Sequence, residues 1–316
     1  MAKIALPKII CVVGPTASGK SAVGIELARQ FKGDVISADS RMVYSGMEIG
    51  TATPQGQRES GPHNKPVLRA SDVIHYCIGI VEPNQEYSVI NWKQEAIEAI
   101  KVITSLNRVP VVVGGTGFYI KVLVDNLIPP SVRGGKQLRD ELDEKIKIHG
   151  LEMMVQRLLT LDPGASQIVD LLNPVRVIRA LEVCILTQKP YSQQISKGLP
   201  IVEALQIGLM VEKEELDRRI RERIEEQFSG GLVEEVKELI SRHGYQIGPL
   251  TGFVYKETWD YIEGRLTLVE AKEQIALRTR QYAKRQLTWF KKDKRIHWIK
   301  KPEEAFPLAA QFLKSI

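Results

Sequence analysis

The order of apolar and polar positions predicts alternating strands and helices in the first part of the chain. The stretches 9–13, 34–38 and 111–113 are short and mainly apolar, which is typical of buried parallel strands. Residues 22–31 and 87–106 carry apolar side chains at helical spacing. This alternation predicts an α/β fold with a parallel sheet flanked by helices on both faces.

The pattern changes after the two prolines at 129–130. Residues 131–200 have helical periodicity and no convincing strand, with helices expected over 136–149, 151–160 and 174–187. We therefore predict three segments: the first part of an α/β core (1–130), an all-helical insertion domain (131–200) and the completion of the core (201–316).

The last third of the chain is predicted to return to the sheet once and then to be mainly helical. The expected strands are 204–211 and 296–299, and the expected helices are 214–229, 232–242, 256–263, 267–290 and 302–314. The polar, proline-containing stretch 50–72 is interpreted as a loop or lid.

Composition narrows the class of protein. The chain has 316 residues, of which 43% are hydrophobic and 26% charged, as in ordinary globular proteins. No apolar run approaches the roughly 18 residues of a membrane span, and the first strand starts too early to leave room for a cleavable signal. The three cysteines are scattered, with no CxxC pair. We expect a cytoplasmic protein, a monomer by default, without disulfides or a zinc finger.

Positive charge is concentrated near the C-terminus. The formal net charge is +6, and residues 278–295 hold eight Lys or Arg and one Asp. Tyr282, Trp289 and Phe290 lie among these cations. Basic residues interleaved with aromatic ones suit single-stranded RNA, but a solvated helix face explains the charge equally well, and Trp289 and Phe290 fit a core better than base stacking.

The segment from Gly14 to Ser21 has the pattern GxxxxGKS between a predicted strand and a predicted helix, which is the context of a P-loop. Its backbone amides would hold the phosphates of a diphosphate or triphosphate, Lys20 would add a point charge, and the Ser21 hydroxyl would be a ligand for Mg²⁺. The alternative is a chance match at a turn. The residues expected at the phosphates are Gly14, Thr16, Ala17, Ser18, Gly19, Lys20 and Ser21.

Polar residues follow two of the predicted strands, where ligands of open α/β sheets bind. Asp39 could be a Mg²⁺ ligand, a general base or a helix cap. Thr116, in Gly114–Gly117, could donate to a bridging oxygen, although a plain tight turn is also possible. Among the charged residues of 216–228, Arg219 and Arg223 share a helix face, so one or both could reach a diphosphate, although each taken alone fits a surface position better. The five histidines are dispersed and are assigned no catalytic role.

Almost the whole chain resembles the tRNA dimethylallyltransferases, also called tRNA isopentenyltransferases. The matching stretches are GPTASGKS (14–21), DS (39–40), GMEIGTATP (46–54), EPNQEYSV (82–89), VVVGGTGFYIK (111–121), RVIRALEV (176–183), LDRRI (216–220), GLVEEV (231–236) and RTRQYAKRQLTWF (278–290). Such enzymes transfer a prenyl group from dimethylallyl diphosphate to N6 of the adenosine 3′ to the anticodon of tRNA.

The resemblance implies a P-loop α/β core with a helical insertion, and roles for named residues. Asp39 would be the base, Thr116 would assist at the bridging oxygen, and Lys20, Ser21 and Arg223 would hold the diphosphate with Mg²⁺. The residues that would bind the anticodon stem-loop of tRNA are Asp39, Ser40, Arg41, Met42, Arg139, Arg176, Arg179, Tyr255 and Lys256. The basic stretch would add Arg278, Arg280, Lys284 and Arg285.

The chain departs from the usual family sequence at three places. His-His-Leu-Ile-Asp is replaced by residues 75–79, HYCIG; Asn-Asp-Pro by 172–174, LNP; and Gly-Tyr-Lys/Arg by 254–256, VYK. Three rival functions share the P-loop: the same transfer to free adenine nucleotides, a small-molecule kinase, and an RNA-binding module with a degenerate nucleotide site. The kinase would consume ATP, and neither it nor the nucleotide enzyme needs the basic stretch.

Overall fold

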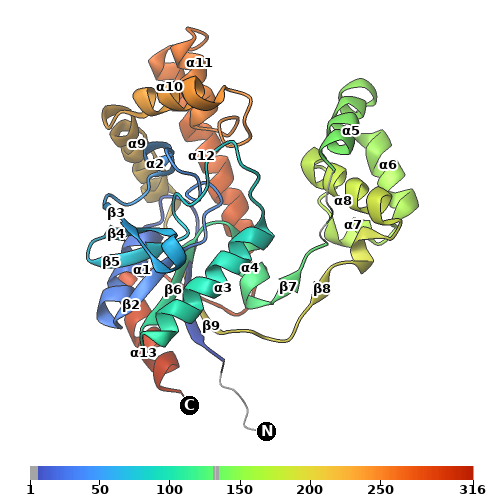
Figure 1. Cartoon of the computed structure of the whole chain (residues 1–316). Coiled ribbons are helices and arrows are strands. Elements are labelled where there is room, and N and C mark those ends of the chain that lie inside the picture. Colours follow the sequence, from blue (N-terminus) through green and yellow to red (C-terminus); the bar gives the residue numbers. More distant parts are fainter. Residues whose placement is uncertain (1–5, 131, 133–134, 316) are drawn as a thin grey trace. The chain divides into compact units, whose positions relative to one another are not determined.

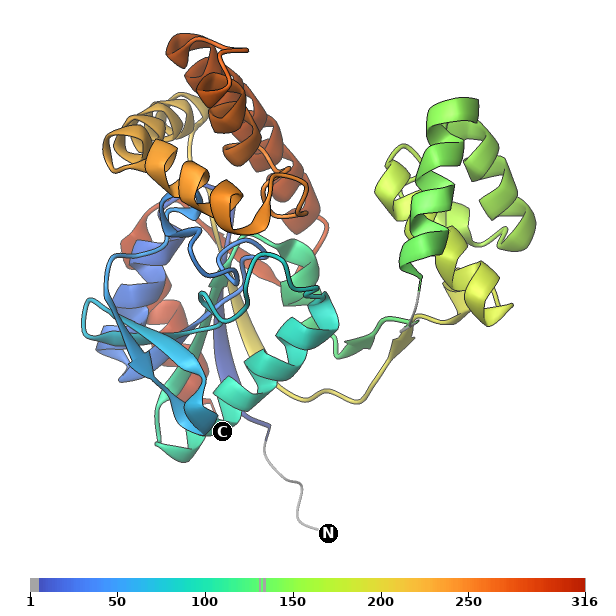
Figure 2. The ribbon, with the colours of Figure 1, turned by 45° about the horizontal axis from the view of Figure 1, so that its top comes forward.

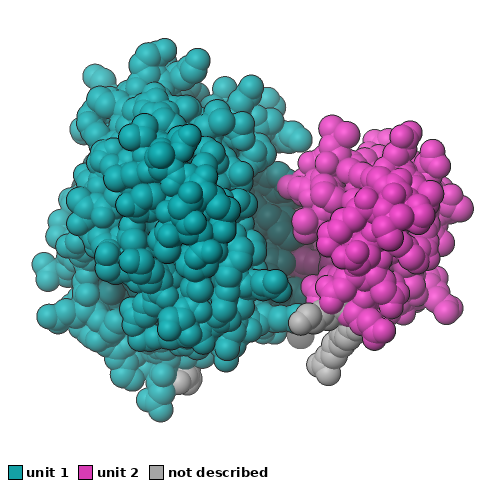
Figure 3. All heavy atoms as spheres, turned by 90° about the horizontal axis from the view of Figure 1, so that it is seen from above, with its two compact units in different colours: residues 1–124, 200–316 teal, residues 125–199 magenta. Residues whose placement is uncertain are grey.

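The computed structural model describes residues 6–130, 132 and 135–315. The chain forms two compact units, shown in separate colours in Figure 3. One comprises Met1–Val124 together with Pro200–Ile316, and the other is Asp125–Leu199. The second unit therefore contains all but the last residue of the stretch expected to be a helical insertion, 131–200, and begins a few residues before it.

The first unit is built on an eight-stranded sheet with the order β10-β9-β1-β6-β2-β5-β4-β3 (Figure 1). The six strands from β10 to β5 pair in parallel, and β5, β4 and β3 pair antiparallel at one edge. The strands are β1 (Lys8–Val13), β2 (Gly33–Ser37), β3 (Gln57–Ser60), β4 (Pro66–Ala70), β5 (Val73–Tyr76), β6 (Val109–Gly114), β9 (Glu203–Leu209) and β10 (Ile296–Ile299). The predicted fold class is confirmed.

Helices cover both faces of the sheet because its central strands are apolar on both sides. β1 is buried from Ile9 to Val13. One face packs against α3 (Val89–Ser105) and α4 (Gly117–Val124), and the other against α1 (Lys20–Gln30) and α13 (Ala305–Lys314). Figure 2 shows these layers from a second direction.

The interpretation of 50–72 as a loop is wrong. This stretch holds the end of α2 (Glu48–Thr51), the short 3₁₀ turn η1 (Pro62–Asn64) and the edge strands β3 and β4. β3 has no apolar alternation and is held by backbone pairing to β4 and by the Arg69–Glu59 ion pair, 2.6 Å between Nε and Oε1. An edge strand with polar side chains on both faces leaves no hydrophobic signal in the sequence.

Four helices gather at one end of the sheet around a third apolar cluster (Figure 1). They are α9 (Lys213–Ser229), α10 (Leu232–His243), α11 (Tyr255–Ile262) and α12 (Leu268–Phe290). Every helix predicted in this part of the chain is present within one or two residues, with 302–314 divided between η3 (Pro302–Glu304) and α13.

The second unit has its own apolar core, which includes Leu142, Leu158 and Leu181. Its helices are α5 (Lys136–His149), α6 (Leu151–Leu161), α7 (Ala165–Ile168) and α8 (Pro174–Thr187), with the 3₁₀ turn η2 (Tyr191–Gln193). A two-stranded ribbon, β7 (Leu127–Ile128) with β8 (Ser196–Lys197), joins its ends, so the expectation of no strand in 131–200 was wrong for two residues. Among the described residues, no helix is both long and apolar enough to span a bilayer.

Candidate active site

The P-loop connects the end of β1 to the start of α1. Gly14, Ala17 and Gly19 have φ angles of +150°, +60° and +89°. Glycine adopts such angles without the steric cost that a side chain imposes, so the two glycines allow the tight turn. α1 then begins at Lys20 without a side-chain cap. Its first amides point at the loop, as in an anion-binding helix terminus.

A residue of α12 that was not predicted to belong to the site joins the P-loop to the turn after β6 by hydrogen bonds. Gln286 on α12 accepts a hydrogen bond from Thr16 N through Oε1 at 2.8 Å and donates one to Gly115 O through Nε2 at 2.9 Å. The Thr16 amide therefore already has a hydrogen-bond acceptor within the protein. Ser18 Oγ is buried and has no hydrogen-bond partner in the described part of the chain, so a phosphate oxygen would satisfy it.

Lys20 lies within the loop, with Nζ donating to Pro15 O at 3.1 Å. Burial lowers the pKa of Lys20 to about 8, because desolvation disfavours the ammonium form. The Asp39 carboxylate opposes this shift, and the neighbouring Arg223 adds to it. Lys20, Asp39 and Arg223 are thus close enough to interact electrostatically.

Two arginines of α9 reach the P-loop, an arrangement that their shared helix face had left open. Arg223 donates to Thr16 Oγ1 at 3.2 Å and to Thr51 O at 2.9 Å, and burial lowers its pKa. Arg219 donates to Ser18 O at 3.2 Å. Arg218 and Arg221 instead form ion pairs with glutamates at the surface.

The segments that carry Asp39 and Thr116 lie side by side just after the ends of β2 and β6. Asp39 Oδ1 accepts hydrogen bonds from the amides of Arg41 at 2.9 Å and Met42 at 3.4 Å, so the carboxylate does cap the following turn. Thr116 Oγ1 accepts from Ser40 N at 3.1 Å. The Gly114–Gly117 turn therefore also orients a hydroxyl beside the segment that carries Asp39.

Thr16 of the P-loop, Asp39 and Arg223 border a cavity of about 260 Å³. Its walls come from the P-loop, from the segment after β2, and from α2, α9, α11 and α12. The polar side chains that line it are Thr16, Asp39, Ser40, Arg41, Thr51, Arg223, Gln227, Tyr255, Thr279 and Tyr282. The sequence analysis noted Tyr282 only for its aromatic ring among cations and missed Thr51 and Gln227, which lie far from the P-loop in the chain.

The P-loop offers few protein ligands for Mg²⁺, which suits an ion held mainly by substrate oxygens. The Ser21 side chain is exposed at the start of α1. Within the described residues, no group of three or more His, Cys, Asp or Glu side chains could hold a metal. Mg²⁺ commonly binds through one or two protein oxygens, water and substrate phosphates, so Ser21 with a diphosphate would suffice.

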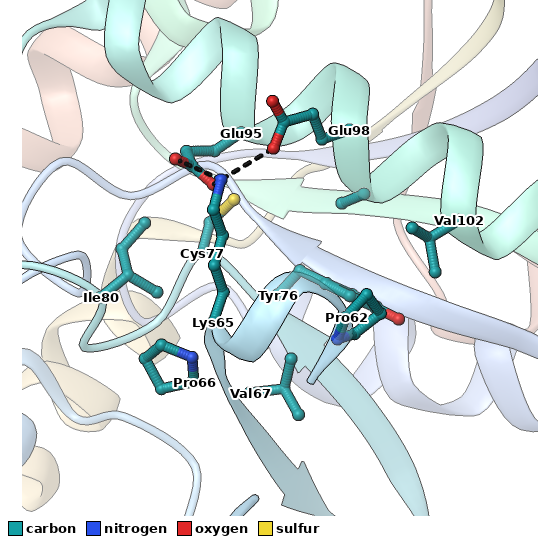
Figure 4. Close-up of a pocket in the computed structure, with 11 residues that line it drawn as sticks. Pro62, Lys65, Pro66, Val67, Tyr76, Cys77, Ile80, Glu95, Glu98 and Val102 are labelled. Atoms are coloured by element: carbon teal, nitrogen blue, oxygen red, sulfur yellow. Dashed lines mark hydrogen bonds and ion pairs between the residues drawn. The ribbon is translucent and has the colours of Figure 1, made fainter. Parts of the chain in front are cut away.

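A second cavity is much smaller and is lined by none of the candidate site residues (Figure 4). It has a volume of about 30 Å³ and lies between β5 and α3, with Tyr76 and Cys77 on one wall. The Lys65 side chain borders this cavity, and its Nζ forms ion pairs with Glu95 at 2.8 Å and Glu98 at 2.7 Å. Its size suits one or two water molecules.

The residues expected to touch tRNA in the first unit have varied surroundings. Arg41 donates to Pro249 O at 2.8 Å at the cavity wall. Met42 accepts a hydrogen bond from Ser37 through Sδ. Tyr255 is 3% exposed, and its hydroxyl proton is shared between two acceptors, Met47 O and Glu235 Oε1, both 2.9 Å away. The Tyr255 hydroxyl therefore braces α2 from inside the cavity wall.

The remaining candidate cations of the first unit lie on α11 and α12. Lys256 pairs with Asp260 at 2.5 Å, Arg278 with the buried Glu257 at 2.8 Å, and Arg280 with Asp217 at 2.5 Å. Arg285 lies over the Tyr282 ring, 5.8 Å from its centroid, and Lys284 is exposed. Phe290 is 2% exposed and Trp289 packs against the core, as expected.

In the second unit, Arg139 and Arg179 share one buried carboxylate. Glu182 is 1% exposed and pairs with Arg139 at 3.3 Å and with Arg179 at 2.5 Å. Arg176, on α8 with Arg179, pairs with Asp170 at 3.5 Å. Two guanidinium groups on one carboxylate leave a surplus positive charge at this surface.

The parallel sheet, the glycine-rich turn and the helix that follows it define a P-loop α/β protein with an added helical unit. Residues 42–293 match the model of a known family, IPP transferase. The chain belongs to the IPP transferase family, and the resemblance inferred from the motifs is confirmed.

Individual relatives match over nearly their full length. The chain is 39% identical to the tRNA dimethylallyltransferase of Pelotomaculum thermopropionicum over 92% of this chain and 90% of the relative. Among solved structures, it is similar to the tRNA isopentenylpyrophosphate transferase of Bacillus halodurans, with 32% identity, 97% coverage of both chains and a TM-score of 0.68. The corresponding transferase of Staphylococcus epidermidis gives 30% identity, 98% and 100% coverage, and a TM-score of 0.66.

Proposed function

We propose that this protein transfers the dimethylallyl group of dimethylallyl diphosphate to N6 of the adenosine 3′ to the anticodon in tRNA, releasing diphosphate. The names of its relatives support the reaction class. The observation that carries the proposal is that the P-loop, Arg223 and Asp39 border one cavity, with the Thr116 hydroxyl bonded to its wall. A diphosphate and an amine can therefore meet there.

The cations of the site suit a diphosphate leaving group. Lys20 and Arg223 are half-buried beside the P-loop, where charge acts more strongly than in water. As the bond between C1 of the prenyl group and the bridging oxygen breaks, its electron pair goes to the diphosphate. These groups, which are in place beforehand, stabilise the charge that develops. Mg²⁺ held by Ser21 would further neutralise the phosphate oxygens when bound.

Asp39 is suited to take the proton from the incoming amine. Among the described residues, the two hydrogen bonds that the Asp39 side chain accepts both go to Oδ1, which leaves Oδ2 for the substrate. The N6 amine forms its bond to C1 and loses one proton to Asp39, so the amine becomes secondary and neutral. Thr116 would donate to the bridging oxygen that leaves.

For transfer to tRNA, the target adenosine must leave the base stack of the RNA to enter the cavity. A loop adenosine does this at small cost, which favours an anticodon-loop substrate. Arg41 at the cavity wall, and Arg139, Arg176 and Arg179 in the second unit, would contact the RNA. Transfer to a free adenine nucleotide is the second candidate function, because the cavity alone could take a mononucleotide.

The test of the base is Asp39→Asn in the full-length protein. The amide keeps the shape but accepts no proton, so we expect kcat to fall by about 10²–10⁴-fold, with KM for dimethylallyl diphosphate nearly unchanged. Asp72→Asn, an exposed carboxylate in the turn before β5, is the matched control and should behave as the unaltered protein. Full prenyl transfer by the Asp39→Asn protein would remove Asp39 from the role of base.

A further inference from the structure

The turn that carries Thr116 lies beside the P-loop because the two segments follow neighbouring parallel strands. β1 and β6 pair with Val13 opposite Gly114, so both segments leave the sheet at the same level. A Cβ added at Gly115 would lie 3.5 Å from Gly14 O. Two groups with separate parts in the proposed reaction, the P-loop amides and the Thr116 hydroxyl, thus belong to adjacent turns.

The Gln286 side chain of α12 lies across these two turns. Its Oε1 accepts a hydrogen bond from Thr16 N at 2.8 Å, and its Nε2 donates one to Gly115 O at 2.9 Å. Gln286 is 6% exposed, so water has little access to either bond. A Cβ at Gly115 would lie 2.1 Å from Nε2, so the amide can approach the turn this closely only because the residue is glycine.

The two bonds require one group that accepts a hydrogen bond at one atom and donates at the next. A planar carboxamide does both, with its oxygen and nitrogen at a fixed separation. The orientation of the Gln286 amide follows from its partners, because Thr16 N can only donate and Gly115 O can only accept. A carboxylate could not make the second bond, and an apolar side chain could make neither.

α12 contacts the same turn at a second point. Trp289 is three residues after Gln286, on the same side of the helix. A Cβ at Gly117 would lie 2.1 Å from Trp289 Cδ1, so the indole ring packs directly against the turn. The Thr116 hydroxyl, which precedes Gly117, also accepts from Ser40 N at 3.1 Å. The turn is therefore held both by α12 and by the segment after β2.

We propose that Gln286 is a positioning residue, which sets the spacing between the P-loop and the Thr116 hydroxyl through its two hydrogen bonds. In the proposed reaction the P-loop holds the phosphates and Thr116 donates to the bridging oxygen, so both must fit one diphosphate. A misplacement of about 1 Å in such an arrangement can cost about 10²-fold in rate. This role rests on the proposed function, because it requires a diphosphate leaving group.

The first test is Gln286→Met in the full-length protein, because methionine keeps the length of the side chain and removes both polar atoms. We expect the single-turnover rate of prenyl transfer to tRNA to fall about tenfold, and the Kd of inorganic diphosphate with Mg²⁺ to stay within about threefold. In a Thr116→Val background, the same change should lower the rate less than about twofold, since the hydroxyl that Gln286 positions is then absent.

Gln311→Met is the matched control, at an exposed glutamine of α13, and should leave the rate unaltered. An unchanged rate in Gln286→Met would overturn the proposal. A full tenfold loss in the Thr116→Val background would also overturn it. So would a diphosphate Kd that weakens by the same factor as the rate, because Gln286 would then act only on the shape of the P-loop.

A second variant, Gln286→Glu, restores the bonding pattern only when the introduced carboxyl group is protonated. The acid form can accept from Thr16 N and donate to Gly115 O, as the amide does, and burial raises the pKa of such a group. We expect its rate, relative to the unaltered protein at the same pH, to rise as the pH falls from about 8 to about 5.5. The ratio for Gln286→Met should stay constant over this range.

A Gln286→Glu protein that is no faster than the Gln286→Met protein at any of these pH values would overturn the positioning role. If the unaltered protein transferred no prenyl group to tRNA, the proposed function itself would fail. Transfer by the unaltered protein together with an unaffected Gln286→Met protein would refute the role of Gln286 alone.

Discussion

Lys20 and Arg223 lie beside Asp39 in the part of the molecule where a diphosphate is expected. Desolvation lowers the pKa of both cations, Arg223 lowers that of Lys20 further, and the Asp39 carboxylate compensates only in part. A dianionic ligand would supply the missing negative charge. The unliganded site is therefore electrostatically strained in a way that diphosphate binding relieves.

The pKa of Lys20 predicts the pH dependence of substrate capture. Lys20 is protonated below a pKa of about 8 in the unliganded protein and loses its charge as the pH rises through that value. We expect kcat/KM for dimethylallyl diphosphate to fall above about pH 8, because this ratio reports the free enzyme. The fall in kcat should begin at higher pH, since bound diphosphate favours the ammonium form.

The measurement is a steady-state pH profile from about pH 6 to 9.5 at saturating tRNA. A value of kcat/KM that stays constant to the upper end would contradict the assignment of Lys20 as the titrating group.

At the level of single elements, the start of α11 shows a conformation that a β-branched residue rarely adopts. Val254 has φ +78° and ψ −62°. Its amide donates to Glu257 Oε2 at 3.0 Å, and its carbonyl accepts from Thr258 Oγ1 at 2.6 Å. Glu257 is fully buried and is paired with Arg278. These contacts keep the strained turn in place at the wall of the cavity.

This strain predicts an unusual order of stability for substitutions at Val254. Glycine normally costs about 0.5–1 kcal/mol relative to alanine, but glycine adopts a positive φ freely. We therefore expect Val254→Gly to be more stable than Val254→Ala by about 1 kcal/mol, measured by denaturant unfolding of the full chain. At Lys237, an exposed position in the middle of α10, alanine should be the more stable of the pair. An alanine variant at 254 as stable as the glycine variant, or more so, would contradict the presence of strain.

Elements with a clear apolar period could be predicted, and those formed by polar pairing could not. β1, β6 and α12 have buried residues at the spacing of a strand or a helix, so the sequence shows them. β3 reads QRES and is stabilised by its neighbour across the sheet. The pairing of β3 with β4 depends on tertiary structure, and the sequence of β3 alone carries no information about it.

The candidate site was predictable to the extent that its residues belong to short motifs or follow strands. Lys20, Asp39, Thr116 and Arg223 meet these conditions, and the structure brings them together. Gln286 was missed because its contacts reach 270 residues back along the chain. A polar residue at helical spacing from Tyr282, on a helix otherwise classed as basic, was the available signal.

Across the whole molecule, ion pairs with other helices neutralise part of the positive charge of residues 278–295. The folded protein therefore has less unpaired positive charge in this stretch than its composition indicates. Arg278 and Arg280 are neutralised by Glu257 and Asp217, which lie on other helices. Their partners are 21 and 63 residues away in sequence, so composition within the stretch could not reveal them. The exposed cations that remain on this stretch, such as Lys284, are the ones suited to RNA phosphates.

The measurement that tests the central claim most directly is a competition between acceptors. Purified full-length protein, Mg²⁺ and labelled dimethylallyl diphosphate would be offered unmodified tRNA and AMP in parallel reactions. Our account predicts label in tRNA and none in AMP. Label in AMP would indicate a nucleotide prenyltransferase, and label in neither acceptor, with ATP consumed when supplied, would contradict prenyl transfer altogether.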